Sequence, residues 1–177
     1  DRTSEVLRDI VVRRFGNDQW KDPVAAGADG WHIEGCPVNG PKIVAAGERV
    51  GVAWFTAPDG APRVRFAWST DGGASFAPAL DLDGAGSFGQ VGLLLDQDGT
   101  AVVSWWRAAR GGGTDLALRT VAPDSTLGAL HVVAHSAEAQ PVDVPQLAAV
   151  GDDLLVAWTS LDGEGTVHVL LVPKVQD

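Results

Sequence analysis

Arg107 has the side chain best suited to hold an anion. It follows Trp105 and Trp106 at the end of an apolar run and precedes a glycine-rich loop. A guanidinium group presents a planar fork of N–H donors that matches the geometry of a carboxylate. The sequence therefore predicts that Arg107 clamps an anionic ligand. Arg119 lies inside a later apolar segment, and we expect it to face solvent or to pair with an acid.

The segment around residue 35 carries the other side chains with chemical potential. Cys36 stands beside Pro37 and is the one cysteine, so it is expected to be a small buried hydrophobe or half of a disulfide with a part of the protein outside this chain. No companion base is evident, which disfavours a nucleophilic role. Asn39 is a turn former or a ligand contact, and His32 is a pocket or structural residue. The remaining histidines, His131, His135 and His168, lack the spacing of metal ligands, which disfavours a zinc site. No metal and no cofactor are expected.

Composition excludes several classes of partner. The formal net charge is −10 and the pI is about 4.6, a balance that repels phosphate backbones and disfavours nucleic-acid binding. No apolar run approaches the ~20 residues that span a bilayer. The chain begins at Asp1, contains no Met and shows no signal-peptide pattern, so we expect it to be a processed or excised piece.

A repeat of about 50 residues organises the chain. Three apolar strands end in Trp54, Trp105 and Trp158, which are 51 and 53 residues apart. Each follows a Gly/Asp turn and an earlier apolar strand, at 42–45, 91–95 and 146–149. Each precedes a third strand, at 64–68, 115–121 and 166–172. Units of this length with four short strands are typical of β-propeller blades.

The repeat predicts an all-β fold of four-stranded antiparallel blades, about three and a half blades of a six-bladed ring. We expect one partial propeller domain, 1–177, divided into the end of one blade (1–28), two full blades (29–83 and 84–135) and an incomplete last blade (136–177). Within 1–28, residues 9–14 are interpreted as a third strand, 16–20 as a degenerate turn motif, and Trp20 as the aromatic that closes it. A β-sandwich is the alternative, and the regular spacing disfavours it.

The turn after residue 68 has its own signature. Ser69, Asp71, Gly73, Ser75 and Phe76 fit the pattern Ser-x-Asp-x-Gly-x-Ser/Thr-aromatic. The carboxylate can accept N–H groups of the loop, and glycine adopts positive φ without a Cβ penalty. Phe76 can then fold back onto the sheet. The role predicted for these residues is structural.

This pattern is the Asp-box, and the segment resembles sialidase-like β-propellers. The runs 8–14, 29–41 and 52–56 resemble a group of bacterial secreted BNR-repeat proteins described as exo-sialidase-like. The resemblance covers nearly the whole chain, and it implies further blades before Asp1 and a secreted or periplasmic location.

Propeller geometry selects the candidate site. The loop that enters each innermost strand and the loop that joins the second and third strands lie on one face, where ligands bind. The ligand-binding candidates chosen from these loops are Arg107, Asn39, Trp31, His32, Gln90, Arg8 and Asp9. The same loops also contain Arg2, Glu5, Glu34, Cys36, Asp59, Ser87, Arg110, Asp143, Gln146, Asp162 and Glu164.

The resemblance to sialidases can be tested on residue types. Sialidases hold the substrate carboxylate with three arginines and use an Asp acid/base and a Tyr nucleophile activated by Glu. This chain has no Tyr. Arg107 or Arg119 can stand for one of the arginines, but the nucleophile has no counterpart, so catalysis by the usual route is not expected.

Three hypotheses follow. In the first, a non-catalytic propeller binds a glycan or a protein on the channel face, where Trp31, Trp105 and Trp106 are either stacking platforms or, for at least two of them, buried between blades. In the second, the protein is an exo-sialidase-like glycoside hydrolase whose catalytic groups lie partly in missing N-terminal blades. In the third, the chain is a structural half-propeller whose open edges are closed by those blades or by a second copy.

Overall fold

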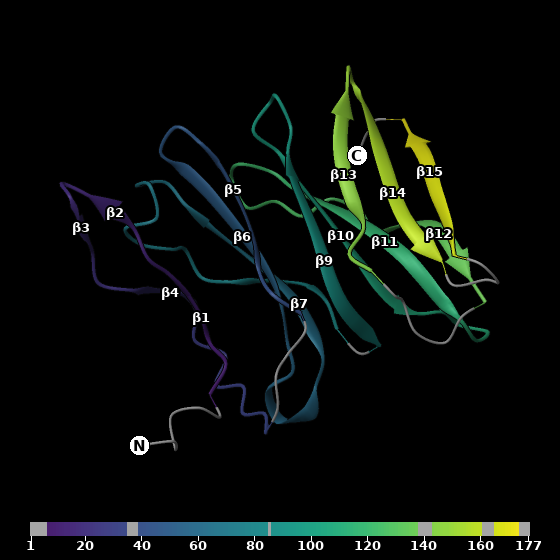
Figure 1. The fold of residues 1–177 in the computed structure, drawn as a ribbon, viewed down its shortest axis with the longest axis horizontal. Coiled ribbons are helices and arrows are strands. Elements are labelled where there is room, and N and C mark those ends of the chain that lie inside the picture. The colour runs from purple at the N-terminus through teal and green to yellow at the C-terminus, as the bar shows by residue number, and fades with distance from the viewer. Residues whose placement is uncertain (1–6, 35–38, 85, 138–142, 161–164, 174–177) are drawn as a thin grey trace.

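The computed structural model describes residues 7–34, 39–84, 86–137, 143–160 and 165–173. These residues form antiparallel β-sheets joined by turns and a short 3-10 turn at Pro58–Gly60 (Figure 1). Among the described residues no helix is long and apolar enough to cross a membrane.

The strands are grouped in the order that the repeat predicts. The first sheet pairs β1 (Ile10–Val12) with β4 (Val24–Gly27), and a small hairpin of β2 (Phe15–Gly16) and β3 (Gln19–Trp20) lies between them in the chain. The second sheet has the order β5 (Lys42–Ala46), β6 (Arg49–Thr56), β7 (Arg63–Ser69), β8 (Leu80–Asp83). The third has the order β9 (Ser87–Leu95), β10 (Ala101–Ala108), β11 (Thr114–Val121), β12 (His131–Ser136), and the fourth has β13 (Gln146–Val150), β14 (Asp153–Ser160), β15 (Thr166–Val172).

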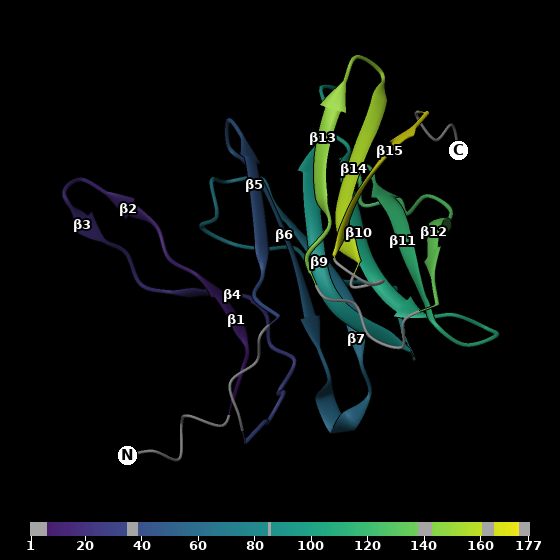
Figure 2. The same ribbon diagram turned by 45° about the vertical axis from the view of Figure 1, so that its right-hand side comes forward.

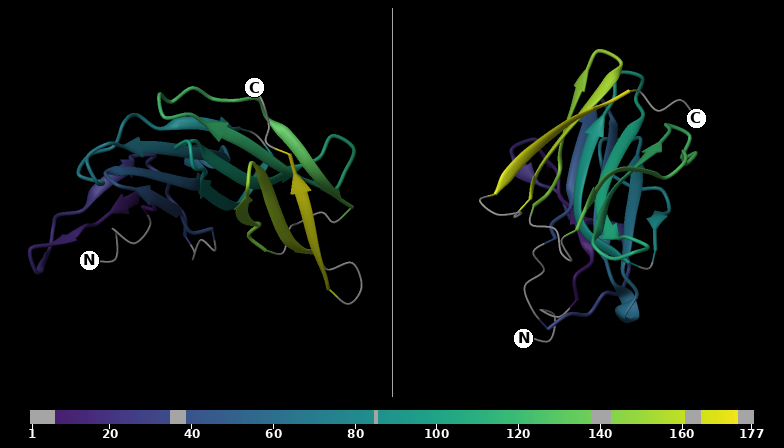
Figure 3. Two further views of the ribbon diagram at one scale, coloured as in Figure 1. Left: turned by 90° about the horizontal axis from the view of Figure 1, so that it is seen from above. Right: turned by 90° about the vertical axis from the view of Figure 1, so that its right-hand side faces the viewer.

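The sheets follow an arc when the molecule is seen from above (Figure 3). Such an arc of successive antiparallel sheets, of which the second and third have four strands, is a partial β-propeller. The hairpin β2–β3 stands apart at one end of the arc, and β13–β15 form the other end (Figure 2).

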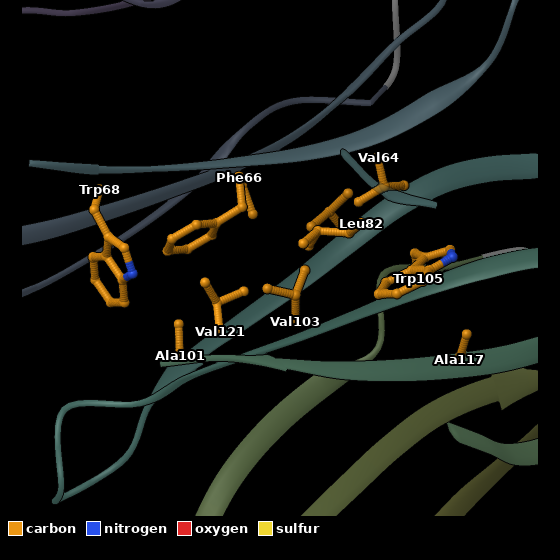
Figure 4. Packing of buried hydrophobic residues seen from close by; sticks show 11 residues of the cluster. Val64, Phe66, Trp68, Leu82, Ala101, Val103, Trp105, Ala117 and Val121 are labelled. Atoms are coloured by element: carbon orange, nitrogen blue, oxygen red, sulfur yellow. The ribbon is translucent and has the colours of Figure 1, made fainter. Parts of the chain in front are cut away.

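Apolar cores lie between successive sheets, and we call each such interface a joint. Ala26 of the first sheet packs with Val52 and Trp54 of the second in the first joint. The second joint is the largest, and Figure 4 shows Phe66 and Trp68 of β7 facing Val103 and Val121 of the third sheet. Trp106, Leu116, Leu118 and Val156 make the third joint. Because side chains alternate between the faces of a strand, each inner sheet contributes to two joints.

Gly51 of β6 lies against two aromatic rings of the neighbouring strand β7, where no side chain would fit. A Cβ on Gly51 would lie 2.8 Å from ring carbons of both Phe66 and Trp68, which pack edge to face. The absence of a side chain at Gly51 therefore leaves room for the rings of Phe66 and Trp68 to pack over β6.

Trp20 stands four residues before β4, as Phe76 stands four residues before β8, and its role as the aromatic that closes the turn stays a prediction. Its side chain is 59% exposed and packs against Phe15 of the same hairpin, with the Arg13 guanidinium 5.8 Å from the ring centroid. Phe76, the residue to which it was compared, packs against Ile10 and Val12 of the preceding sheet. The described residues place no sheet ahead of β1, so Trp20 has no such surface to cover.

Asp71 organises the turn between β7 and β8. Its carboxylate accepts hydrogen bonds from the backbone N–H groups of Ala74 and Ser75 and from the hydroxyls of Ser69 and Ser75, at 2.6–2.9 Å. The Ser69 hydroxyl also accepts the N–H of Gly73, which has a φ of 81°. The hydrogen bonds from the Ser75 hydroxyl and N–H, with that from Ser69, hold the pKa of Asp71 well below its usual range.

Asp71→Asn is expected to weaken the acid dependence of stability. A carboxyl whose pKa is depressed by folding stabilises the native state above its unfolded pKa of about 4, and this contribution is lost as the pH falls towards the folded value. The melting temperature of the wild type should therefore fall below about pH 4, and the variant should show a smaller fall and a lower melting temperature at pH 7. Thermal melts from pH 2 to 7 measure this. Asp18→Asn, in the exposed β2–β3 turn, is the control, and equal pH profiles of wild type and Asp71→Asn would contradict the prediction.

Candidate functional site

One end of the sheets gathers the loops from which the candidates were chosen. The β6–β7 and β10–β11 connections and the starts of β9 and β13 lie at this end, which is the lower end in Figure 1. We call it the strand-entry end. The turns between β7 and β8 and between β9 and β10 lie at the opposite end.

A row of polar residues crosses the third sheet near the strand-entry end. The strand register places Arg107 of β10 opposite Ser87 of β9 and Asp115 of β11. Asp115 in turn lies opposite His135 of β12, whose Nδ1 is 2.9 Å from the Asp115 carboxylate. Opposed residues point to the same face, so Ser87, Arg107, Asp115 and His135 form one row across the four strands, which we call the polar row.

Among the described residues, Arg107 makes fewer hydrogen bonds with protein acceptors than Arg63, Arg65 and Arg119 do. Its side chain is 26% exposed, and its ion pair in the described part of the chain joins Nη1 to the Asp83 carboxylate at 3.4 Å, beyond ordinary hydrogen-bond length. Asp83 is 10% exposed and already accepts the Trp105 indole N–H at 2.8 Å. The Ser87 hydroxyl is buried, and no described residue hydrogen-bonds it. The polar row therefore holds two donors without a close acceptor among the described residues, the Arg107 guanidinium and the Ser87 hydroxyl. Beside them lies the Asp83 carboxylate, which the Trp105 indole holds in place.

A hollow of about 430 Å³ lies beside Asp83, at the outer side of the second joint. Its polar groups are those of Arg63, Asp81, Asp83 and Arg119. Asp81 is held by Arg63 at 3.1 Å and by Arg65 at 2.6 Å. The carboxylates of the hollow are thus already paired with cations.

The expectation that Arg119 faces solvent or pairs with an acid is wrong. Its Nε donates to the carbonyl of Gly128 at 2.7 Å and its Nη1 to the carbonyl of Leu82 at 2.9 Å. Arg119 therefore joins the second and third sheets through backbone acceptors, which satisfies a partly buried guanidinium without a carboxylate.

Asp29 forms the equivalent centre at the first joint. Its buried carboxylate accepts the Trp54 indole N–H at 2.6 Å and pairs with the Arg65 guanidinium. Burial lowers the pKa of Arg65, but its hydrogen bonds to Asp81 and Asp29 outweigh that effect and raise the pKa above its usual value. The same indole-to-carboxylate hydrogen bond therefore occurs at successive joints, between Trp54 and Asp29 and between Trp105 and Asp83.

Asn39 and Gln90 are brought together. The Asn39 amide donates to the carbonyl of Phe88 at 3.0 Å and accepts the N–H of Gln90 at 2.9 Å. Gly89 and Gln90 have φ of 79° and 52°, and a Cβ on Gly89 would lie 2.8 Å from both Asn39 and Phe55. Asn39 thus clasps an irregular stretch of β9, which is a structural contact between the second and third sheets.

The predicted residues of the first joint form a separate group. Asp9 accepts the N–H of Gly30 at 2.8 Å, His32 Nδ1 lies 2.8 Å from the Gly30 carbonyl, and the N–H of Arg8 donates to the Trp31 carbonyl at 2.8 Å. The Trp31 ring is 8% exposed and packs edge to face on Phe55. The structure does not bring this group to Arg107, which lies in the third sheet.

The three tryptophans proposed as stacking platforms, Trp31, Trp105 and Trp106, are buried and cannot stack on a sugar ring. Trp105 and Trp106 are 0% and 2% exposed, and Trp106 donates its indole N–H to the carbonyl of Asp143 at 3.2 Å. With Trp31 also buried, none of the three presents a ring face, and all serve packing between sheets.

The other loop candidates have local roles or lie outside the described residues. Asp143 accepts the N–H of Thr159 at 2.7 Å, Gln146 donates to the Val144 carbonyl, and Asp59 sits in the 3-10 turn with a φ of 53°. The candidates that lie outside the described residues are Arg2, Glu5, Cys36, Asp162 and Glu164.

Sequence reasoning missed Asp83, Asp115 and His135. Asp83 ends β8 and belongs to no loop at the strand-entry end that was considered. The signal for Asp115 was available, because the loop 109–113 joins two strands and pairs residue 107 with residue 115. Within the described segments no group of three or more His, Cys, Asp or Glu side chains is placed to hold a metal ion.

Comparison with known proteins shows the fold. No protein-family model matches the chain, and no curated protein sequence matches it. Solved structures do match, including a thermostable family-43 glycoside hydrolase (TM-score 0.59, 13% identity, 94% of this chain and 62% of that one). The Hadza microbial sialidase Hz136 matches with a TM-score of 0.59 and 17% identity, over 94% of this chain and 39% of that one. The endo-arabinase from Bacteroides thetaiotaomicron VPI-5482 matches with a TM-score of 0.59 and 16% identity, over 92% of this chain and 66% of that one.

These likenesses extend over nearly all of this chain but over less than two thirds of each matched chain. At such identities they show the architecture and not the activity. The chain is therefore a partial β-propeller of the kind found in glycoside hydrolases.

Proposed function

We propose that this chain is part of a sialidase-like, Asp-box β-propeller that binds a glycan at the polar row without cleaving it by the usual sialidase route. The hydrogen-bonded turn at 69–76 and the matched sialidase fold support the family part of this proposal. The resemblance to bacterial secreted proteins supports a secreted or periplasmic location.

The observation that carries the binding proposal is the state of Arg107. Arg63, Arg65 and Arg119 each donate hydrogen bonds to fixed protein acceptors. Arg107 is partly buried, and the described residues offer it only the 3.4 Å contact with Asp83. A partly exposed guanidinium fork with unused donors is suited to a carboxylate or to sugar hydroxyls.

Its neighbours supply the mixed polarity that a sugar requires. Asp115 offers a carboxylate and His135 an imidazole along the same row, in which the Ser87 hydroxyl is buried. A glycan hydroxyl is both donor and acceptor, so a row of alternating donors and acceptors can bind several of them at once. Arg107 selects for an acidic sugar.

The described residues do not favour catalysis. The chain has no Tyr for the sialidase nucleophile. The hollow that contains Asp81 and Asp83 favours a glycoside hydrolase as the second candidate, because such enzymes use two carboxylates. Both lie on β8, however, and are paired with Arg63, Arg65, Arg107 and Trp105, so a hydrolase would need a further acid from outside this chain.

Arg107→Ala is expected to weaken the binding of carboxylate-bearing oligosaccharides at least tenfold, because the cation that pairs with the sugar carboxylate is lost. Calorimetric titration with matched acidic and neutral oligosaccharides measures this. Arg110→Ala, in the exposed loop three residues after Arg107, should leave the affinity unchanged. The proposal fails if no acidic sugar binds or if Arg107→Ala binds as wild type does, and release of free sugar would instead favour the hydrolase.

A further inference from the structure

We propose that the polar row binds a zwitterionic sugar, one whose ring bears a free amine as well as a carboxylate. This inference rests on the proposed function of the row, in which Arg107 pairs with the carboxylate of the ligand. It adds that Asp115 pairs with the ammonium group, so the ligand must carry both charges.

Arg107 and Asp115 lie opposite each other on β10 and β11, so their side chains leave the same face of the third sheet. The Cβ atoms of such a pair are about 4.5–5.5 Å apart, which is close enough for a direct ion pair. Arg107 instead turns to Asp83 of the second sheet, at 3.4 Å. Asp115 turns to His135 of β12, at 2.9 Å. A cation and an anion therefore occupy neighbouring positions without neutralising each other.

Asp115 has capacity left for a ligand. Its side chain is 20% exposed, and its partner among the described residues is the Nδ1 atom of His135, which is charged only when the imidazole is protonated. A carboxylate has two oxygens and about four lone-pair sites. A contact with one nitrogen therefore leaves acceptors for the N–H groups of an ammonium ion.

Arg107 has the matching capacity for a carboxylate. Its contact with Asp83 involves Nη1 alone, whereas a guanidinium carries five N–H donors on three nitrogens. Because neighbouring strands lie about 4.8 Å apart, groups on adjacent carbons of one sugar ring can reach Arg107 and Asp115 together.

The balance of charge in the row disfavours ligands of a single sign. Arg107 supplies one positive charge, and Asp83 and Asp115 supply two negative charges. A sugar with a carboxylate alone would bring an anion beside Asp115, and a sugar with an amine alone would bring a cation beside Arg107. Like charges placed together lower the affinity for the wrong partner. A ring with both groups meets an opposite charge at each position.

Muramic acid is the probe, because its ring bears an amine and a carboxylate-bearing lactyl ether on adjacent carbons. Three related sugars complete the set: N-acetylmuramic acid lacks the amine, glucosamine lacks the carboxylate, and N-acetylglucosamine lacks both. Calorimetric titration of the full chain at pH 7 should show muramic acid binding at least tenfold more tightly than each of the other three.

Asp115→Asn tests where the amine binds. This variant removes the charge but keeps the shape of the side chain, so its preference for muramic acid over N-acetylmuramic acid should fall below threefold. Its affinity for N-acetylmuramic acid should equal or exceed that of wild type, because the repulsion between two carboxylates is removed, and this affinity also reports a folded site. Asp59→Asn removes an exposed carboxylate from the β6–β7 connection and should keep the tenfold preference.

The outcomes separate this inference from the proposed function. Equal wild-type affinity for muramic and N-acetylmuramic acid would overturn the inference, and loss of both sugars in Arg107→Ala would then leave the proposed function standing. A preference for the amine that persists in Asp115→Asn would also overturn the inference, because the amine would bind elsewhere. If neither carboxylate-bearing sugar bound to wild type, the proposed function would fail and the inference with it.

Discussion

Asp29→Ala is expected to lower the free energy of unfolding by about 3–5 kcal/mol, the cost of removing one partner from a buried ion pair. The Asp29 carboxylate has 0% exposed side-chain surface and serves Trp54 and Arg65 together. Its removal leaves an indole N–H and a guanidinium in the first joint without their acceptor. Urea denaturation of wild type and variant, followed by tryptophan fluorescence, measures the difference.

Two control variants allow the effect of Asp29→Ala to be assigned to its buried ion pair. Asp29→Asn keeps an acceptor for Trp54 but removes the charge that pairs with Arg65, so its loss should be smaller than that of Asp29→Ala. Asp59→Asn, in the 3-10 turn, should change the stability by less than about 0.5 kcal/mol, because Asn tolerates the positive φ of this exposed position as Asp does. A loss below about 1 kcal/mol for Asp29→Ala would show that the first joint does not depend on this pair.

Trp105→Ala should cost about 3–5 kcal/mol, because a fully buried indole leaves a cavity in the second joint. Trp105→Phe keeps most of the apolar volume but removes the N–H that Asp83 accepts, and should cost about 1–3 kcal/mol. Urea denaturation measures the loss in free energy of unfolding for each variant. A larger loss for Trp105→Ala than for Trp105→Phe would show that packing contributes more than the hydrogen bond.

Trp20→Ala is the matched control for Trp105→Ala, since Trp20 is exposed and contacts its own hairpin. It should melt close to wild type. If Trp105→Phe proved as destabilising as Trp105→Ala, the tie to Asp83 rather than the packed ring would dominate this joint.

The architecture was predictable because its signals are local. Strand alternation, Gly/Asp turns and Trp54, Trp105 and Trp158 at regular intervals each depend on a few neighbouring residues. They led to the observed order of strands and sheets. Burial is less local: Trp20 holds the sequence position that corresponds to Phe76, yet its side chain is exposed, because no described residue lies opposite it.

The site could be predicted only in part. Arg107 was found from its residue type and position, but its row with Ser87, Asp115 and His135 comes from the register of four strands. Asn39 was expected in a turn or on a ligand, whereas its partners are backbone groups 49 and 51 residues away.

The sequence by itself determined the repeat, the strands and the turn chemistry of Asp71, because these follow from propensity, alternation and hydrogen bonds within a few residues. The tertiary structure alone decided that Asp29 and Asp83 tie the joints and that Arg107 keeps unused donors. Those features depend on the packing of one sheet against the next, which brings together residues far apart in the chain.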